Sequence, residues 1–124
     1  MGLTVLVVDD DPNTVRLIED SIPWSEYGID QVYSAYQGAQ ALELVAEHEP
    51  DIVISDIEMP QMDGHRLVKL MKEDPELKEI PIIIFSSLIN DDMRRKGDAL
   101  GADAQLSKNQ MGEFVDTVDR FLRK

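Results

Sequence analysis

The chain has 124 residues, no cysteine and a net charge of −13 from 25 acidic and 12 basic residues. This length suits a single domain over residues 1–124, and neither a membrane-spanning apolar run nor a secretory leader is visible, so we expect a cytoplasmic domain without a membrane partner. The charge opposes contact with nucleic-acid phosphates, although solubility alone explains the acidity equally well. With only His48 and His65 beside the carboxylates, any metal would be held by oxygen.

Strand-like and helix-like segments alternate along the chain. The run 4–8 is apolar, too short for a helix and bounded by charge, which predicts a strand buried on both faces. Asp11 and Pro12 then predict the start of a helix that ends at Pro23. The same criteria predict strands at 31–35, 52–55, 82–85 and 104–107, and helices around Leu42 and Val45, at 64–74, at 91–100 and through Phe114 to Leu122. Five strand-helix units in this order predict an α/β fold with a doubly wound parallel sheet.

Polar side chains follow four of the predicted strands. Asp9 and Asp10 follow the first strand, Asp56 the third, Ser86 the fourth and Lys108 the fifth. Because the carboxyl ends of parallel strands share one edge of a sheet, we expect these groups to meet in one crevice. Taken singly, the acidic triplet 9–11 could be a solvated turn and helix cap, Lys108 a surface lysine and Ser86 a hydroxyl bonded to backbone. Their coincidence at strand ends favours a site.

The chemistry of this group of residues suits a cation and a phosphoryl group. Neighbouring carboxylates repel one another, and a hard cation such as Mg²⁺ relieves this repulsion, with Asp10 and Asp56 as candidate ligands. A carboxylate can also act as a nucleophile and form an acyl phosphate. Phosphoryl transfer then needs only fixed positive charge and hydrogen-bond donors, which Lys108 and Ser86 could supply.

Four stretches carry a resemblance to a known family: Val7-Val8-Asp9-Asp10-Asp11-Pro12, the segment from Asp56 through Glu58 and Pro60 to Asp63-Gly64, the strand end at Ser86, and Gly101-Ala102 leading to Lys108. Together they resemble the receiver domain of bacterial response regulators over essentially the whole chain. The resemblance implies a flavodoxin-like (βα)5 fold with strand order 2-1-3-4-5 and a signalling switch rather than a classical enzyme. It also implies phosphorylation of Asp56 by the phosphohistidine of a sensor histidine kinase, with Mg²⁺ near Asp9, Asp10, Asp56 and the backbone carbonyl of Glu58.

A narrower resemblance concerns residues 86–97 and 101–108, which are similar to the receiver halves of CheV-type chemotaxis coupling proteins. It would place the switch in a chemotaxis signalling complex and make the chain a fragment of a longer protein with an N-terminal coupling domain. In receivers a Ser or Thr at the position of Ser86 moves toward the phosphoryl group, which makes Ser86 a candidate switch residue.

Two positions depart from the family pattern. Many receivers have Tyr or Phe where this chain has Gln105, so we expect Gln105 to be a modest switch residue that exchanges hydrogen bonds. Receivers also commonly have a cis proline after the lysine, and here Asn109 follows Lys108. We favour a cis Lys108–Asn109 bond over a trans one, although a non-proline cis bond costs about 2.5–4 kcal/mol.

Three other functions compete with the switch. An aspartate-nucleophile phosphohydrolase of the haloacid-dehalogenase type would need a second Asp two positions after its nucleophile, where Glu58 stands. A non-phosphorylated interaction module would tend to lose site residues, and none is missing. A dinucleotide-binding enzyme is the weakest alternative because no glycine-rich loop follows the first strand.

Overall fold

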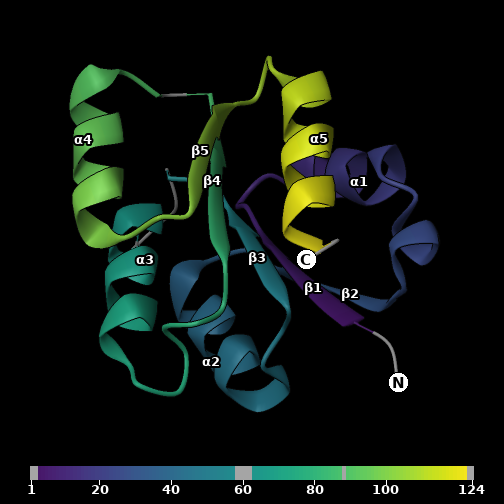
Figure 1. Ribbon diagram of the computed structural model, residues 1–124, viewed down its shortest axis with the longest axis horizontal. Helices are drawn as coiled ribbons and strands as arrows, with labels where there is room; N and C mark the ends of the chain where they lie inside the picture. Colours follow the sequence, from purple (N-terminus) through teal and green to yellow (C-terminus); the bar gives the residue numbers. More distant parts are fainter. Residues whose placement is uncertain (1–2, 58–62, 88, 123–124) are drawn as a thin grey trace.

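The computed structural model describes residues 3–57, 63–87 and 89–122. Five parallel strands form one sheet in the order β2-β1-β3-β4-β5, and helices alternate with them along the chain (Figure 1). The strands are β1 (Leu3–Val8), β2 (Ile29–Ala35), β3 (Ile52–Ser55), β4 (Ile82–Ser86) and β5 (Ala104–Ser107). The helices are α1 (Pro12–Ser21), α2 (Gly38–His48), α3 (Gly64–Glu73), α4 (Asp91–Leu100) and α5 (Met111–Leu122). This architecture confirms the flavodoxin-like fold and the strand order that the sequence predicts.

Two differences from the sequence prediction lie before and within β2. The strand begins at Ile29, two residues earlier than expected, and a short 3₁₀ helix, η1 (Trp24–Tyr27), precedes it. The indole Nε1 of Trp24 donates a hydrogen bond to the backbone oxygen of Glu19 at 3.1 Å, and the ring is buried. This hydrogen bond joins η1 to α1. Local sequence periodicity does not predict a tertiary contact of this kind.

The sheet separates two apolar layers, because successive side chains of a strand point to opposite faces. In β1, Val5 and Val7 pack with α1 and α5, whereas Leu6 and Val8 pack with α2 and α3. All four are at most 1% exposed. A strand buried on both faces must be apolar at every position, which explains why these runs do not alternate. The side chains that follow them are therefore held on a rigid support.

Helix α4 is the most thinly packed of the helices. Gly97 is its only buried residue, and Met93 and Leu100 are partly buried against the core. Its N-terminus is nevertheless well defined, since the Asn90 side chain accepts the backbone N–H of Met93 at 2.9 Å. The otherwise polar helix therefore contacts the core through a narrow inner stripe.

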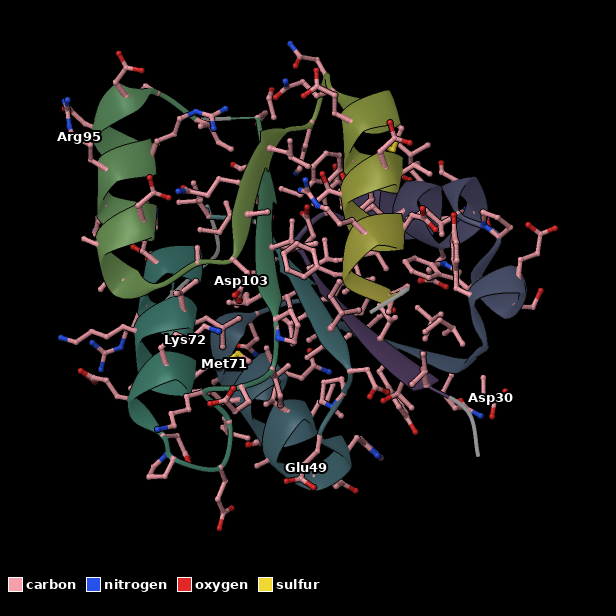
Figure 2. All side chains as sticks on the ribbon, in the orientation of Figure 1. Asp30, Glu49, Met71, Lys72, Arg95 and Asp103 are labelled. Carbon is pink, nitrogen blue, oxygen red and sulfur yellow. The ribbon has the colours of Figure 1, made fainter. Side chains whose placement is uncertain are left out.

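A lysine joins α3 to the opposite end of the sheet from the predicted site. The Lys72 Nζ lies 2.9 Å from Asp103 Oδ2 and also donates to the backbone oxygens of Lys78 and Ile80 (Figure 2). Asp103 Oδ2 in turn accepts the backbone N–H of Ile82 at 2.8 Å. This network fixes α3 against the starts of β4 and β5.

No helix within the described ranges has the length and apolarity to cross a membrane.

Candidate phosphorylation and metal site

Asp9 and Asp56 lie side by side at the carboxyl ends of β1 and β3. Their backbones continue the sheet: the Asp9 N–H donates to the Ala35 oxygen at 3.0 Å and the Asp56 N–H to the Val8 oxygen at 2.9 Å. Both residues are buried, with 2% and 6% exposure. Each also accepts a local backbone N–H, from Asp11 to Asp9 Oδ1 at 2.9 Å and from Ile57 to Asp56 Oδ1 at 2.7 Å. The fold thus fixes both carboxylates in defined orientations.

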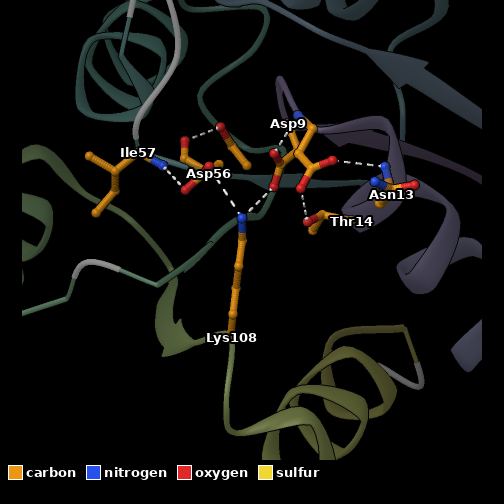
Figure 3. A network of polar contacts seen from close by, with 8 residues as sticks. Asp9, Asn13, Thr14, Asp56, Ile57 and Lys108 are labelled. Atoms are coloured by element: carbon orange, nitrogen blue, oxygen red, sulfur yellow. Dashed lines mark hydrogen bonds and ion pairs between the residues drawn. The ribbon is translucent and has the colours of Figure 1, made fainter.

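Lys108 bridges these two carboxylates from β5. Its Nζ lies 2.8 Å from Asp9 Oδ2 and 3.3 Å from Asp56 Oδ2 (Figure 3). The backbone N–H of Lys108 donates to the Ser86 oxygen at 3.0 Å, which aligns the lysine with the end of β4. The sequence prediction that strand ends bring these residues together is confirmed for Asp9, Asp56 and Lys108.

Asp10 completes a group of three carboxylates. One oxygen from each of Asp9, Asp10 and Asp56 lies within 4.8 Å of the others, and Asp10 is exposed where its neighbours are buried. The single Lys108 ammonium cannot neutralise three carboxylates, so negative charge is left over. Oxygen ligands, surplus negative charge and one solvent-facing carboxylate suit a hydrated Mg²⁺, which usually keeps several waters.

Burial governs the protonation of this site. Loss of solvation raises the pKa of Asp9 above its ordinary value, and the Lys108 hydrogen bond and the Asp11 N–H only partly oppose the shift. Burial acts to lower the pKa of Lys108, but the Asp9 hydrogen bond and the negative charges of Asp56 and Asp9 outweigh it and raise that pKa. Lys108 is therefore charged at neutral pH, and it stabilises carboxylates that burial would otherwise penalise.

Ser86 ends β4, and Gln105 lies within the neighbouring strand β5. Ser86 is 1% exposed, and β4 pairs it with Ser107 of β5, beside Lys108. Gln105 is 8% exposed, and its side chain turns toward α4, where Nε2 donates to the Arg94 oxygen at 2.9 Å and to Asp98 Oδ1 at 2.8 Å. The Arg94 Nη1 in turn donates a hydrogen bond to the backbone oxygen of Gln105 at 3.2 Å. At the position where many receivers have an aromatic ring, this chain therefore has a side-chain amide that forms hydrogen bonds with α4.

Gly64 is a site residue that the sequence prediction did not single out. A Cβ on Gly64 would overlap the backbone oxygen of Asp56, and the Gly64 N–H donates to the Ile57 oxygen at 2.8 Å. A glycine directly after the cap residue Asp63 was the available signal. The absence of a side chain at Gly64 lets the start of α3 lie directly against the backbone of Asp56.

The Lys108–Asn109 bond is trans, because no cis peptide bond occurs among the described residues, so the favoured cis geometry was wrong. Lys108 reaches both carboxylates from a trans backbone, and the cost of a non-proline cis bond is avoided. The backbone carbonyl of Glu58, the fourth expected metal ligand, lies outside the described residues.

Comparisons with known proteins agree with this geometry. The family model of the response regulator receiver domain matches residues 5–119. The polar-differentiation response regulator DivK of Brucella ovis is 30% identical over 126 aligned residues, which cover 98% of each chain. A putative response regulator from Chloroflexus aurantiacus superposes with a TM-score of 0.87 at 28% identity over 100% of both chains. The Vibrio cholerae chemotaxis protein CheY4 superposes with a TM-score of 0.85 at 26% identity over 98% of this chain and 99% of the other.

Receiver domains are the signalling switches of two-component systems, which histidine kinases phosphorylate and which bind Mg²⁺ at an acidic pocket. In this chain the cluster of Asp9, Asp10 and Asp56 provides such a pocket. The family match spans nearly the whole chain, and the fold, strand order and site agree with it. The chain belongs to the response regulator receiver domain family.

Proposed function

We propose that this domain is a phosphorylation-dependent switch that accepts a phosphoryl group on Asp56, with Mg²⁺ bound by Asp9, Asp10, Asp56 and the backbone carbonyl of Glu58. In the transfer, the phosphorus–nitrogen bond of the donor phosphohistidine breaks, its electron pair stays on the imidazole, and an oxygen–phosphorus bond forms at the Asp56 carboxylate. Bound Mg²⁺ would neutralise charge on the phosphoryl oxygens. The protein supports its own phosphorylation and slow dephosphorylation by positioning these groups, without a separate catalytic base.

One observation carries this proposal: Lys108 contacts two buried carboxylates that follow the adjacent strands β1 and β3, beside a third carboxylate that faces solvent. When Asp56 becomes an acyl phosphate, its carboxylate charge moves outward onto the phosphoryl oxygens. Lys108 is only 23% exposed and already within reach, so it can follow that charge with little loss of solvation. Ser86, the buried last residue of β4, would be a second contact for the phosphoryl group.

The phosphoacceptor can be tested directly by incubating the protein with Mg²⁺ and acetyl phosphate and measuring its intact mass. A lasting gain of about one phosphate supports the switch, and Asp56→Asn should abolish that gain while the distant exposed variant Asp30→Asn retains it. Fast release of inorganic phosphate with no lasting gain would favour the phosphohydrolase, and no reaction would favour the non-phosphorylated interaction module. Phosphate gained at Asp9 or Asp10 in Asp56→Asn would show that the assignment is wrong.

The pathway is a separate part of the proposal. The motif resemblance to CheV-type proteins and the fold shared with a chemotaxis protein of Vibrio cholerae support a sensor kinase of chemotaxis as donor, in the cytoplasm. The chain would then work either as one receiver domain over 1–124 or beside a coupling domain in a longer protein. Phosphotransfer from a purified chemotaxis kinase, compared with transfer from a kinase that serves a polar-differentiation regulator, tests this choice. Faster transfer from the second kinase would refute the chemotaxis assignment.

A further inference from the structure

A groove of about 350 Å³ lies between α3 and α4. Residues of the α3 side and of the α4 side form its two walls, and none of them contributes to the Asp9, Asp56 and Lys108 network. The lining residues are Asp63, His65, Arg66, Lys69, Lys96 and Leu100. The phosphorylation chemistry therefore leaves this groove unexplained.

The groove carries a charge opposite to that of the rest of the protein. Helices α3 and α4 hold six of the twelve basic residues of a chain whose net charge is −13, against four acidic ones. Arg66 and Lys69 lie one turn apart on α3, and Lys96 faces them from α4. Asp63 is the only carboxylate among the lining residues, so the three cations leave the groove net positive on an acidic molecule.

The three cations of the groove are not engaged in ion pairs within the described part of the chain. Two other basic residues of the same helices do form ion pairs. Lys72 binds Asp103, and Arg95, which points away from the body of the protein, binds Asp92 (Figure 2). Arg66, Lys69 and Lys96 thus keep their charge available for a ligand. A partner would not have to break an existing ion pair to reach them.

The floor of the groove adds apolar contact and an unsatisfied polar atom. Leu100 is half-buried at one end, one turn beyond Lys96. The His65 ring is 3% exposed, and its buried Nε2 has no hydrogen-bond partner among the residues that the structure describes.

We propose that this groove binds an acidic segment of a partner protein. Its carboxylates would contact Arg66, Lys69 and Lys96, and an apolar side chain of the segment would cover Leu100. Cations spread along two walls suit a peptide with several carboxylates better than one compact anion, and the apolar end suits a mixed acidic and apolar sequence. A nucleic acid is a poorer occupant, because its long phosphate backbone would also meet the strongly acidic remainder of the domain.

Fluorescence anisotropy with a labelled peptide of repeated Glu-Glu-Leu triplets tests this surface. We expect saturable binding that weakens with salt, and a Gln-Gln-Leu peptide should bind far more weakly. The double variant Lys69→Gln/Lys96→Gln should lose affinity roughly tenfold, as expected for the loss of two exposed charge contacts. The matched double variant Arg16→Gln/Lys78→Gln removes the same charge from exposed positions outside the groove and should bind like the parent.

Three results would overturn the proposal: equal losses in both double variants, equal binding of the two peptides, or a single-stranded oligonucleotide that displaces the acidic peptide at lower concentration than unlabelled peptide does. Amide chemical shifts should change around Arg66 and Lys96, and shifts confined to other faces would also refute the assignment. The binding is measured on the unphosphorylated protein and should persist in Asp56→Asn. Its outcome is therefore separate from that of the phosphorylation experiment.

Discussion

Gly97 of α4 and Gln105 of β5 interlock: a Cβ on Gly97 would overlap the Oε1 of the Gln105 side chain. That side chain is buried and donates to the Arg94 oxygen and to Asp98 Oδ1, one on either side of the glycine. The glycine thus leaves room for an amide that attaches the helix to the edge strand. This polar contact holds a helix that has little apolar packing of its own.

Replacing Gly97 with alanine should destabilise the fold, although alanine normally favours a helix by about 1 kcal/mol. The new Cβ would displace the Gln105 amide and cost two partly buried hydrogen bonds of about 1 kcal/mol each, for a net loss of about 1 kcal/mol. Urea unfolding measures the change. Gly112→Ala, where a Cβ meets nothing within 4 Å, is the control and should not destabilise. In the Gln105→Ala background Gly97→Ala should become neutral or stabilising, and an equal loss in both backgrounds would contradict the interlock.

Asp10→Asn should raise the melting temperature of the metal-free protein and weaken its response to Mg²⁺. The substitution removes one of three carboxylates whose oxygens lie within 4.8 Å, and Mg²⁺ stabilises only the folded arrangement of those ligands. Calorimetry with and without Mg²⁺ measures both effects, with the exposed variant Asp30→Asn as control. A lower metal-free melting temperature in Asp10→Asn would mean that this carboxylate supports the fold instead of straining it.

Lys108→Ala should destabilise the metal-free protein by on the order of 3 kcal/mol, because it leaves Asp9 and Asp56 buried without their shared cation. The two contacts argue that this substitution lowers the stability of the fold as well as impairing phosphorylation. Mg²⁺ should restore part of the stability, since it supplies positive charge to the same oxygens. Unfolding midpoints with and without Mg²⁺ test this, and the exposed variant Lys78→Ala should match the parent. Equal midpoints for Lys108→Ala and the parent would show that the ion pairs contribute nothing.

His65 should make the stability of the domain depend on pH in the acidic range. Burial, helped by the nearby charge of Lys96, lowers the pKa of His65 below its ordinary value of 6.5, against the opposing effects of Asp63 and the Met93 backbone. Between the two pKa values His65 binds a proton in the unfolded chain but not in the folded protein. The free energy of unfolding therefore falls as the pH drops below 6.5 toward the lowered pKa. His65→Leu should remove this loss, and Lys96→Gln should reduce it. Parallel stability curves for the parent and His65→Leu between neutral and acidic pH would contradict the assignment.

Phosphorylation should alter amide exchange in α4, because β5 pairs with the Ser86 end of β4 and holds the thinly packed α4 through Gln105. Exchange with and without the beryllofluoride mimic should differ most in α4 of the parent. Ser86→Ala should largely lose the difference. The hydrogen bonds of Gln105 to α4 argue for a larger role in the switch than the modest one expected from the sequence. Gln105→Ala should therefore raise amide exchange in α4 with and without beryllofluoride, while part of the difference between the two states remains. An unchanged α4 in the parent, or a response that survives in Ser86→Ala and disappears in Gln105→Ala, would refute this route.

The sequence determined the sheet and the position of the site because both follow from local pattern. Continuous apolar runs predict strands buried on both faces, and the residue after each run must lie at the shared carboxyl edge, so Asp9, Asp56 and Lys108 could be placed together. The helix starts at Pro12 and Gly64 were likewise visible in local cap chemistry. The strand order came only with the family resemblance, since local pattern does not specify which strands pair.

Tertiary structure alone decided the contacts between residues that are distant in sequence. The orientation of Lys108 across two carboxylates, the trans bond after it and the anchor of Trp24 on α1 depend on packing that no local pattern encodes. The same holds for Gly97, which looks like a helix-weakening residue until the buried Gln105 amide is found against it. Sequence spacing fixes which residues reach an edge of the sheet. Their distances, partners and protonation follow from burial and from the neighbours that other parts of the chain bring to them.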